Sequence, residues 1–131
     1  MAVNRKPRAA RNPYFGALTA TFTINAQVST ARTINVQLAN RGADAAERVP
    51  IMAYLSSDAA GDVVHATAPS GGWAVGTDGS LIASVTTNKV AHWITEADGD
   101  LDIVITSTAW TGYLNVLIGG RKFTSAAIVI A

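Results

Sequence analysis

Apolar and polar residues alternate in short runs along most of this chain, and this pattern predicts β-strands. Residues 17–25 carry apolar side chains at every second position and threonines between them: Leu18, Ala20, Phe22 and Ile24 against Thr19, Thr21 and Thr23. Successive side chains of a strand point to opposite faces, so one face of this strand is expected to be buried. Residues 28–39 repeat the pattern with Ile34, Val36 and Leu38 inward.

The middle of the chain predicts shorter strands between turns. Residues 49–57 are apolar on both faces, which indicates a central strand, and residues 63–66 predict a brief edge strand. Residues 45–48 are compatible with one helical turn. Residues 67–80 hold four glycines and one proline and predict an irregular stretch. The runs 81–86 and 90–95 flank a short turn and predict a hairpin or a bulge.

The last third of the chain, residues 89–131, predicts the element around which the domain is built. Leu101, Ile103 and Ile105 alternate with polar neighbours, and the next apolar run ends at Gly119-Gly120, which suits a tight hairpin turn. We interpret this segment as a meander of consecutive strands. With the earlier runs it gives about eight or nine strands separated by turns, which is typical of an all-β sandwich.

The first sixteen residues differ from the rest and are predicted to form an extended basic arm ahead of a sandwich domain at 17–131. Pro7 and Pro13 disfavour a helix there. The arm is expected to contact a neighbouring subunit through its basic residues and an aromatic anchor: Arg5, Lys6, Arg8, Arg11, Tyr14 and Phe15. From residue 12 onward six basic and nine acidic side chains leave a net charge of about −3. A solvated terminus is the alternative interpretation.

Composition narrows the classes of function. At 131 residues the chain is expected to be one domain, and its 15% of charged residues is low enough to suggest that partners cover part of its surface. The absence of cysteine excludes disulfides, cysteine-ligated zinc and thiol nucleophiles. No apolar run is long enough for a signal peptide or a membrane span, so we expect neither secretion nor a membrane partner.

One acidic cluster is the best candidate for a metal site: Glu96, Asp98, Asp100 and Asp102. Calcium prefers several oxygen ligands, which this spacing could supply from a curled loop. Asp102, however, already belongs to an alternating strand, and no glutamate follows at the spacing of an EF-hand. We therefore interpret these residues as solvated turn carboxylates and predict no metal.

Catalytic motifs are missing from the sequence. His65 and His92 are the only histidines, too few for a zinc site, and no nucleophile elbow, zinc-protease or P-loop motif is present. The glycine-rich segment 71–76 lacks the lysine that a phosphate loop needs. We predict no enzyme activity, no catalytic residue and no cofactor. Trp73, Trp93 and Trp110 lie in or beside turns, so a carbohydrate-binding module that uses Trp73 or Trp110 is an alternative.

Residues 53–131 resemble a known family. The segments AYLSSDAAGD, GTDGSLIASVTTNKVAHWITEADGDLDIVITSTA and GYLNVLIGGRKFTSAAIVI are similar to small β-rich virion structural proteins of tailed bacteriophages. The resemblance implies an immunoglobulin-like sandwich that acts as a capsid decoration or cement protein.

The same resemblance implies partners and a location. The major capsid protein or other virion proteins would be the partners, with several copies of this chain on the particle, and the location would be the virion, assembled in the host cytoplasm. A tail or head-fibre component is the alternative within this class. Nucleic acid is not expected as a partner, because no basic face on the body supports the arm.

Overall fold

The computed structural model describes residues 18–131, which form β-strands and no helix. The predicted arm, residues 1–16, lies outside the described residues. The first strands are β1 (Leu18–Ile24), β2 (Ala31–Asn40), β3 (Ala43–Asp44), β4 (Pro50–Ser56) and β5 (Trp73–Val75). The remaining strands are β6 (Ser80–Thr86), β7 (Val90–Ile94), β8 (Asp100–Thr106), β9 (Trp110–Ile118), β10 (Arg121–Thr124) and β11 (Ile128–Ile130).

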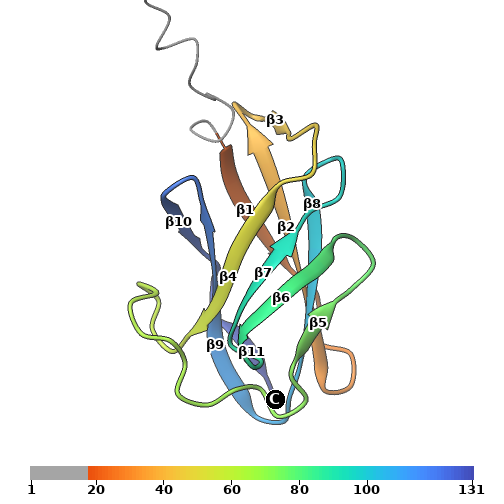
Figure 1. Ribbon diagram of the computed structural model, residues 1–131. Helices are drawn as coiled ribbons and strands as arrows, with labels where there is room; N and C mark the ends of the chain where they lie inside the picture. The colour runs from red at the N-terminus through yellow and green to blue at the C-terminus, as the bar shows by residue number, and fades with distance from the viewer. Residues whose placement is uncertain (1–17) are drawn as a thin grey trace, which may run out of the picture.

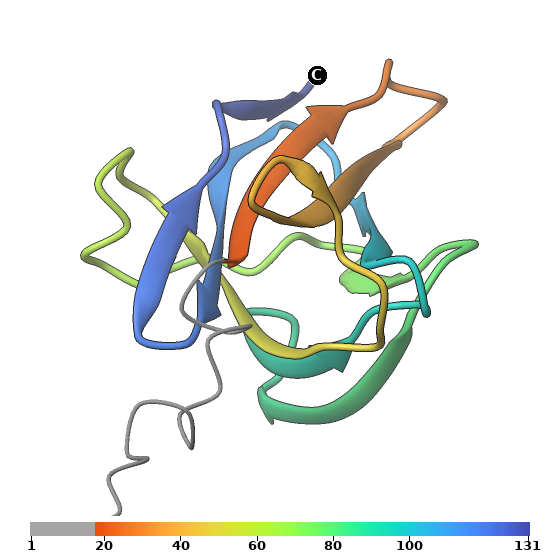
Figure 2. The ribbon, with the colours of Figure 1, turned by 90° about the horizontal axis from the view of Figure 1, so that it is seen from above.

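These strands build two antiparallel sheets that pack face to face, so the predicted all-β sandwich is confirmed (Figure 1, Figure 2). The five-stranded sheet has the order β1-β2-β8-β5, with β3 added to the end of β2. The six-stranded sheet has the order β10-β9-β4-β7-β6, and β11 pairs with β9. β6 is the outermost strand of the six-stranded sheet (Figure 2).

The strand order follows that of an immunoglobulin-type sandwich. In that fold strands A, B, E and D face strands G, F and C. Here β1-β2-β8-β5 takes the first set of places and β10-β9-β4 the second. The hairpin β6–β7 extends the second sheet beyond β4, and it follows β5 in the chain.

Alternating apolar residues fill the space between the sheets, as the sequence predicts. Leu101, Ile103 and Ile105 of β8 are fully buried, as are Leu55 of β4 and Trp93 of β7. Each buried side chain of this size stabilises the fold by about 1.5–3 kcal/mol relative to an exposed one.

The predicted meander in the last third is wrong in its pairing. β7 and β9 belong to the six-stranded sheet, whereas β8 lies between β2 and β5 in the other one. Alternation fixes which face of a strand is buried, but it does not say which sheet the strand joins. The hairpin between β9 and β10 is confirmed: Gly119 and Gly120 both have positive φ, and Arg121 pairs with Ile118.

Three further predictions need correction. Residues 45–48 form no helical turn, because the Ala45 N–H donates to the Leu38 carbonyl at 2.9 Å and continues the sheet edge. The segment 63–66 makes a single bridge, from Val64 to Ser56, instead of a strand. The irregular stretch 67–80 contains β5, and the strand number rises to eleven because β3, β5 and β11 have only two or three residues each.

Candidate functional site

The outer face of the six-stranded sheet is the most distinctive surface of the described residues. No Asp, Glu, Lys or Arg occurs in β4, β6, β7 or β9. The inward side chains of β4 are buried, so its other residues point outward. We call the outward side chains of the three central strands the neutral face: Met52, Tyr54, Val90, His92, Ile94 and Leu117.

The strand register places these side chains next to one another. Met52 lies opposite His92 on β7 and opposite Leu117 on β9, while Tyr54 lies opposite Val90. Cross-strand neighbours on one face are about 4.5–5.5 Å apart at Cβ, so they form one surface. His92 is exposed, and the other five are half-buried. The result is a mostly apolar surface with one imidazole at its centre.

The outer face of the five-stranded sheet has the opposite character. Its outward positions carry hydroxyl, amide and carboxylate groups: Thr19, Thr21 and Thr23 on β1, Thr33, Asn35 and Gln37 on β2, and Asp100 and Asp102 on β8. Such groups are well solvated in water and costly to bury without partners. The two outer faces of the sandwich therefore differ: one is polar and well solvated, and the other is mostly apolar and uncharged.

Beside the neutral face, β6 forms a free edge of the sheet. All seven of its residues are exposed, and its strand partner among the described residues is β7. Leu81 is 44% exposed, Ile82 55% and Val85 57%, which makes three of the seven exposed large hydrophobic residues of the described part. Sheet edges are commonly protected by lysine, proline, inward charges or β-bulges. Of these devices β6 has only bulges, at two places in its register against β7.

A loop closes the other end of the neutral face. The Tyr54 hydroxyl donates to the Gly61 carbonyl, and the Lys122 Nζ donates to the Ala60 carbonyl at 2.7 Å. Lys122 also forms an ion pair with Asp62 at 3.4 Å. A Cβ atom at Gly61 would lie 2.1 Å from Asn115 Oδ1, so only glycine allows the loop to lie this close to β9. The open part of the neutral face thus runs over β4 and β7.

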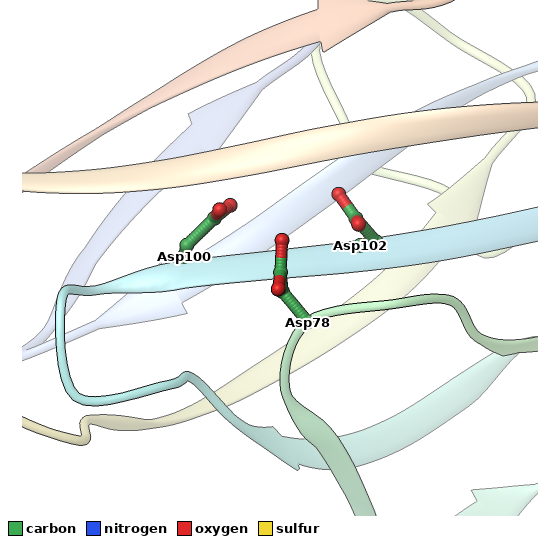
Figure 3. A group of neighbouring side chains, drawn as sticks. All are labelled: Asp78, Asp100 and Asp102. Carbon is green, nitrogen blue, oxygen red and sulfur yellow. The ribbon is translucent and has the colours of Figure 1, made fainter.

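The acidic cluster is rearranged relative to the sequence prediction. Asp100 and Asp102 do lie together on β8, but their third member is Asp78, from the turn before β6 (Figure 3). Their carboxylate oxygens lie within 4.8 Å of one another. Glu96 and Asp98 are not part of this group. A sequence pattern could not identify Asp78, because it lies more than twenty residues away and looks like an ordinary Asp-Gly turn residue.

Protons and amide donors stabilise this group. One Asn35 Nδ2 donates to both neighbouring carboxylates, Asp100 and, at 2.9 Å, Asp102. The hydrogen bond that protonated Asp78 donates to Asp100, followed by burial and the charges of the neighbouring acids, raises the pKa of Asp78 to about 6. Carboxylates can bind a hard cation such as calcium. The Asn35 amide group, however, directs its N–H groups at these carboxylates and would repel a cation. We interpret the group as a structural link between the 76–79 loop, β8 and β2.

The two histidines are placed differently. His65 Nδ1 accepts from the Thr67 N–H at 3.0 Å, so its Nε2 carries the proton and donates to the Thr111 carbonyl at 2.8 Å. Its ring stacks on Trp110 at 4.9 Å between centroids. Both ring nitrogens of His65 are thus hydrogen-bonded to backbone groups. His92 is the exposed imidazole of the neutral face.

The tryptophans lie mainly in the interior. Trp73 is 9% exposed and Trp110 5%, and Trp93 is fully buried. Trp73 and Trp93 pack edge to face, 5.1 Å between ring centroids, inside the sandwich. A sugar platform needs an open ring face, and neither Trp73 nor Trp110 offers one. The predicted contact residues of the arm, from Arg5 to Phe15, lie outside the described residues.

The comparisons with known proteins identify no family for this chain. No family model and no curated protein matches the chain. Among solved structures it is similar to a GH20 exo-β-N-acetylglucosaminidase from Vibrio harveyi, at 7% identity and a TM-score of 0.37 over 88% of this chain. This chain spans 19% of that enzyme. It is also similar to the GAE domain of GGA2p from Saccharomyces cerevisiae, at 14% identity and a TM-score of 0.24, covering 98% of this chain and 91% of that domain. At these scores neither likeness informs function.

Two features of the candidate site have partial signals in the sequence. The two-sided apolar character of residues 49–57 predicts a central strand, and β4 does lie between β9 and β7. The uncharged run at residues 80–86 marks the edge strand, but only its place in the sheet shows that its side chains are exposed.

No helix of the described residues is long and apolar enough to span a membrane.

Proposed function

We propose that this chain is a structural protein of a phage virion, which decorates or cements the outer capsid by binding the major capsid protein. The observation that carries the proposal is the neutral face, on three neighbouring strands without a charged residue, in a domain where five of the nine acids are grouped elsewhere. Desolvation of such a surface costs little free energy. Each Å² of apolar area that a partner covers contributes about 25 cal/mol to the binding free energy.

The rest of the molecule is consistent with such a role. A sandwich held by two sheets offers a rigid platform, so binding would order few side chains and lose little entropy. The basic arm predicted at residues 1–16 would add a second contact, with an acidic surface of a neighbouring subunit, in line with its charge. A tail or head-fibre protein would use the same neutral face, and imaging of the intact particle distinguishes these positions.

The substitution His92→Glu tests the neutral face. His92 is exposed in the isolated chain, so the new carboxylate costs nothing until a partner covers it. We expect binding to weaken by at least about 100-fold, because a buried charge without a partner costs roughly 3 kcal/mol or more. Binding is measured by co-sedimentation with capsids of the encoding virus from which this protein has been removed.

Thr21→Glu is the matched control, because it places the same charge on an exposed residue of the opposite face. It is expected to bind capsids like the unaltered chain. Thermal unfolding confirms that both variants are folded. Full occupancy of the capsid by the His92→Glu variant would show that the neutral face is not the contact surface. Absence of capsid binding by the unaltered chain would contradict the proposed function itself.

A further inference from the structure

We propose that β6 is a pairing edge at which two copies of this chain join, antiparallel and about a two-fold axis, so that the six-stranded sheet continues from one copy into the other. This inference goes beyond capsid binding, because it concerns contact between two copies in solution. It depends on the backbone of β6, the side chains of that strand and the charges that flank it.

One side of β6 is a free backbone edge. β6 pairs with β7 along one side, and no described strand covers the other. A strand edge of seven residues offers N–H and C=O groups along about 23 Å. Such an edge accepts a further strand by main-chain hydrogen bonds.

The side chains of β6 are complementary to those of a second, antiparallel β6. Antiparallel pairing centred on Ala83 places Leu81 opposite Val85 of the other copy and Ser80 opposite Thr86. It places Ile82 opposite Ser84. Apolar pairs and hydroxyl pairs across strands are favourable. A two-fold axis repeats every such pair, so the same few residues supply both halves of the contact.

The distribution of charge in and beside β6 allows two copies to pair. β6 has no charged side chain, so two copies bring no like charges together. The nearest charged residues on either side are Asp78 and Lys89. Antiparallel pairing brings the Asp78 end of one copy to the Lys89 end of the other. No two carboxylates and no two ammonium groups therefore meet at the ends of the contact.

The shape of the edge favours a second copy over an unrelated strand. The register of β6 against β7 shifts between Leu81 and Ala83 and again between Ser84 and Thr86. Such bulges increase the local right-handed twist, and a flat strand cannot follow a strongly twisted one. An identical strand carries the same twist. Another copy of β6 therefore has the twist that this edge requires.

A contact along one strand is small, so the pair is expected to be reversible. Stable complexes bury roughly 1,200–2,000 Å² in total, and smaller contacts are weak or transient. We expect dissociation constants of about 10⁻⁵ M, which corresponds to roughly 7 kcal/mol. The dimer is therefore sought at protein concentrations on both sides of this value, by sedimentation equilibrium on the full chain.

Ile82→Lys and Val85→Lys place a lysine on the edge, as natural protected edges do. Each is expected to give a monomer up to concentrations at least tenfold above those at which the unaltered chain dimerises. Val129→Lys is the control, because Val129 is similarly exposed, at 49%, but lies on β11. A monomeric unaltered chain, or a dimer that both lysine variants retain, would overturn the inference.

Single cysteines test the register. The chain has no cysteine of its own, so Ala83→Cys provides one thiol per copy. At the centre of the pair the two Cα atoms would lie about 4.5–5.5 Å apart, within reach of a disulfide. Ser80→Cys would place its thiols about 20 Å apart. Rapid oxidation to a covalent dimer is expected for Ala83→Cys only, and preferential linkage of Ser80→Cys would contradict the proposed pairing.

Capsid binding by the same variants keeps the two proposals separate. Ile82→Lys changes the edge and leaves His92 in place, so a monomeric variant that still binds capsids supports both proposals. If the unaltered chain is a monomer and nevertheless binds capsids, the pairing edge is wrong and the proposed function stands.

Discussion

At the level of single residues, some properties follow from the local sequence and others only from the tertiary structure. The alternation Leu101, Ile103, Ile105 identifies buried positions from the sequence, because it depends only on the geometry of one strand. Asp78 could not be identified in this way. Its carboxylate acquires its properties from Asp100 and Asp102, which the fold brings to it.

The shared proton of Asp78 predicts a specific dependence on pH. Its pKa rises from 3.8 in the unfolded chain to about 6 in the folded protein, mainly through the hydrogen bond with Asp100. The folded state therefore binds this proton more tightly. The resulting stabilisation is fully present below pH 3.8 and is lost as the pH rises through about 6. The melting temperature is expected to decrease over this interval through the contribution of Asp78.

The substitution Asp78→Asn isolates this contribution. An amide does not titrate and can still donate to the neighbouring carboxylate, so the part of the pH dependence due to Asp78 should disappear. Melting temperatures measured between pH 3.5 and 7 check the expectation, with about half a pH unit between points. Asp98→Asn serves as the control, because Asp98 is exposed and lies outside the group. Equal slopes for the Asp78→Asn variant and the unaltered chain would contradict the assignment.

At the level of elements, the pattern of apolar and polar residues predicts where a strand lies better than it predicts which strands it pairs with. β1, β2, β4 and the hairpins β6–β7 and β9–β10 all follow from alternation and turn residues. The sheet that β8 joins does not follow in this way, because the pattern of a buried strand is the same in either sheet. β5 has no signal of its own, since three residues inside a glycine-rich stretch are too few to show a period.

β9 depends on a glycine in a way that its pattern does not reveal. A Cβ atom at Gly112 would lie 2.4 Å from the Trp110 ring and 3.0 Å from His65. Gly112 also pairs with Ile128 of β11. Gly112→Ala is therefore expected to displace the indole and to destabilise the domain by about 1–3 kcal/mol.

Chemical denaturation compares this variant with Gly120→Ala. Gly120 has a positive φ of 82°, and a Cβ atom added there would meet no other atom within 4 Å. Its substitution therefore measures backbone strain alone, about 1 kcal/mol. An equal loss of unfolding free energy in the two variants would show that the Trp110 ring tolerates the added methyl group.

On the scale of the whole molecule, the described residues form a complete sandwich. Its core extends from Leu18 to Ile130 and joins both sheets. Removal of residues 1–16 is therefore expected to leave the melting temperature unchanged within about 2 °C. If the arm is a capsid contact, as the sequence predicts, the shortened chain should no longer occupy capsids under conditions that saturate the full chain. Undiminished occupancy would exclude the arm as a contact.

The overall architecture was predictable from the sequence and the character of its surfaces was not. The spacing of strands and turns indicates a sandwich, and the absence of charge in four strands is visible in the printed residues. Whether these strands lie together depends on the strand order, which brings β9, β4, β7 and β6 side by side. Long-range pairing of this kind is not encoded in any local pattern.

The grouping of acids at one end has a practical consequence. Five of the nine acidic residues lie on β8, the loop before it and the turn before β6: Asp78, Glu96, Asp98, Asp100 and Asp102. The domain therefore has an electric dipole moment directed away from this end. On a positively charged chromatography resin or sensor chip it would adsorb through these acids in a preferred orientation, and the uncharged sheet would remain turned toward the liquid, ready for a binding partner.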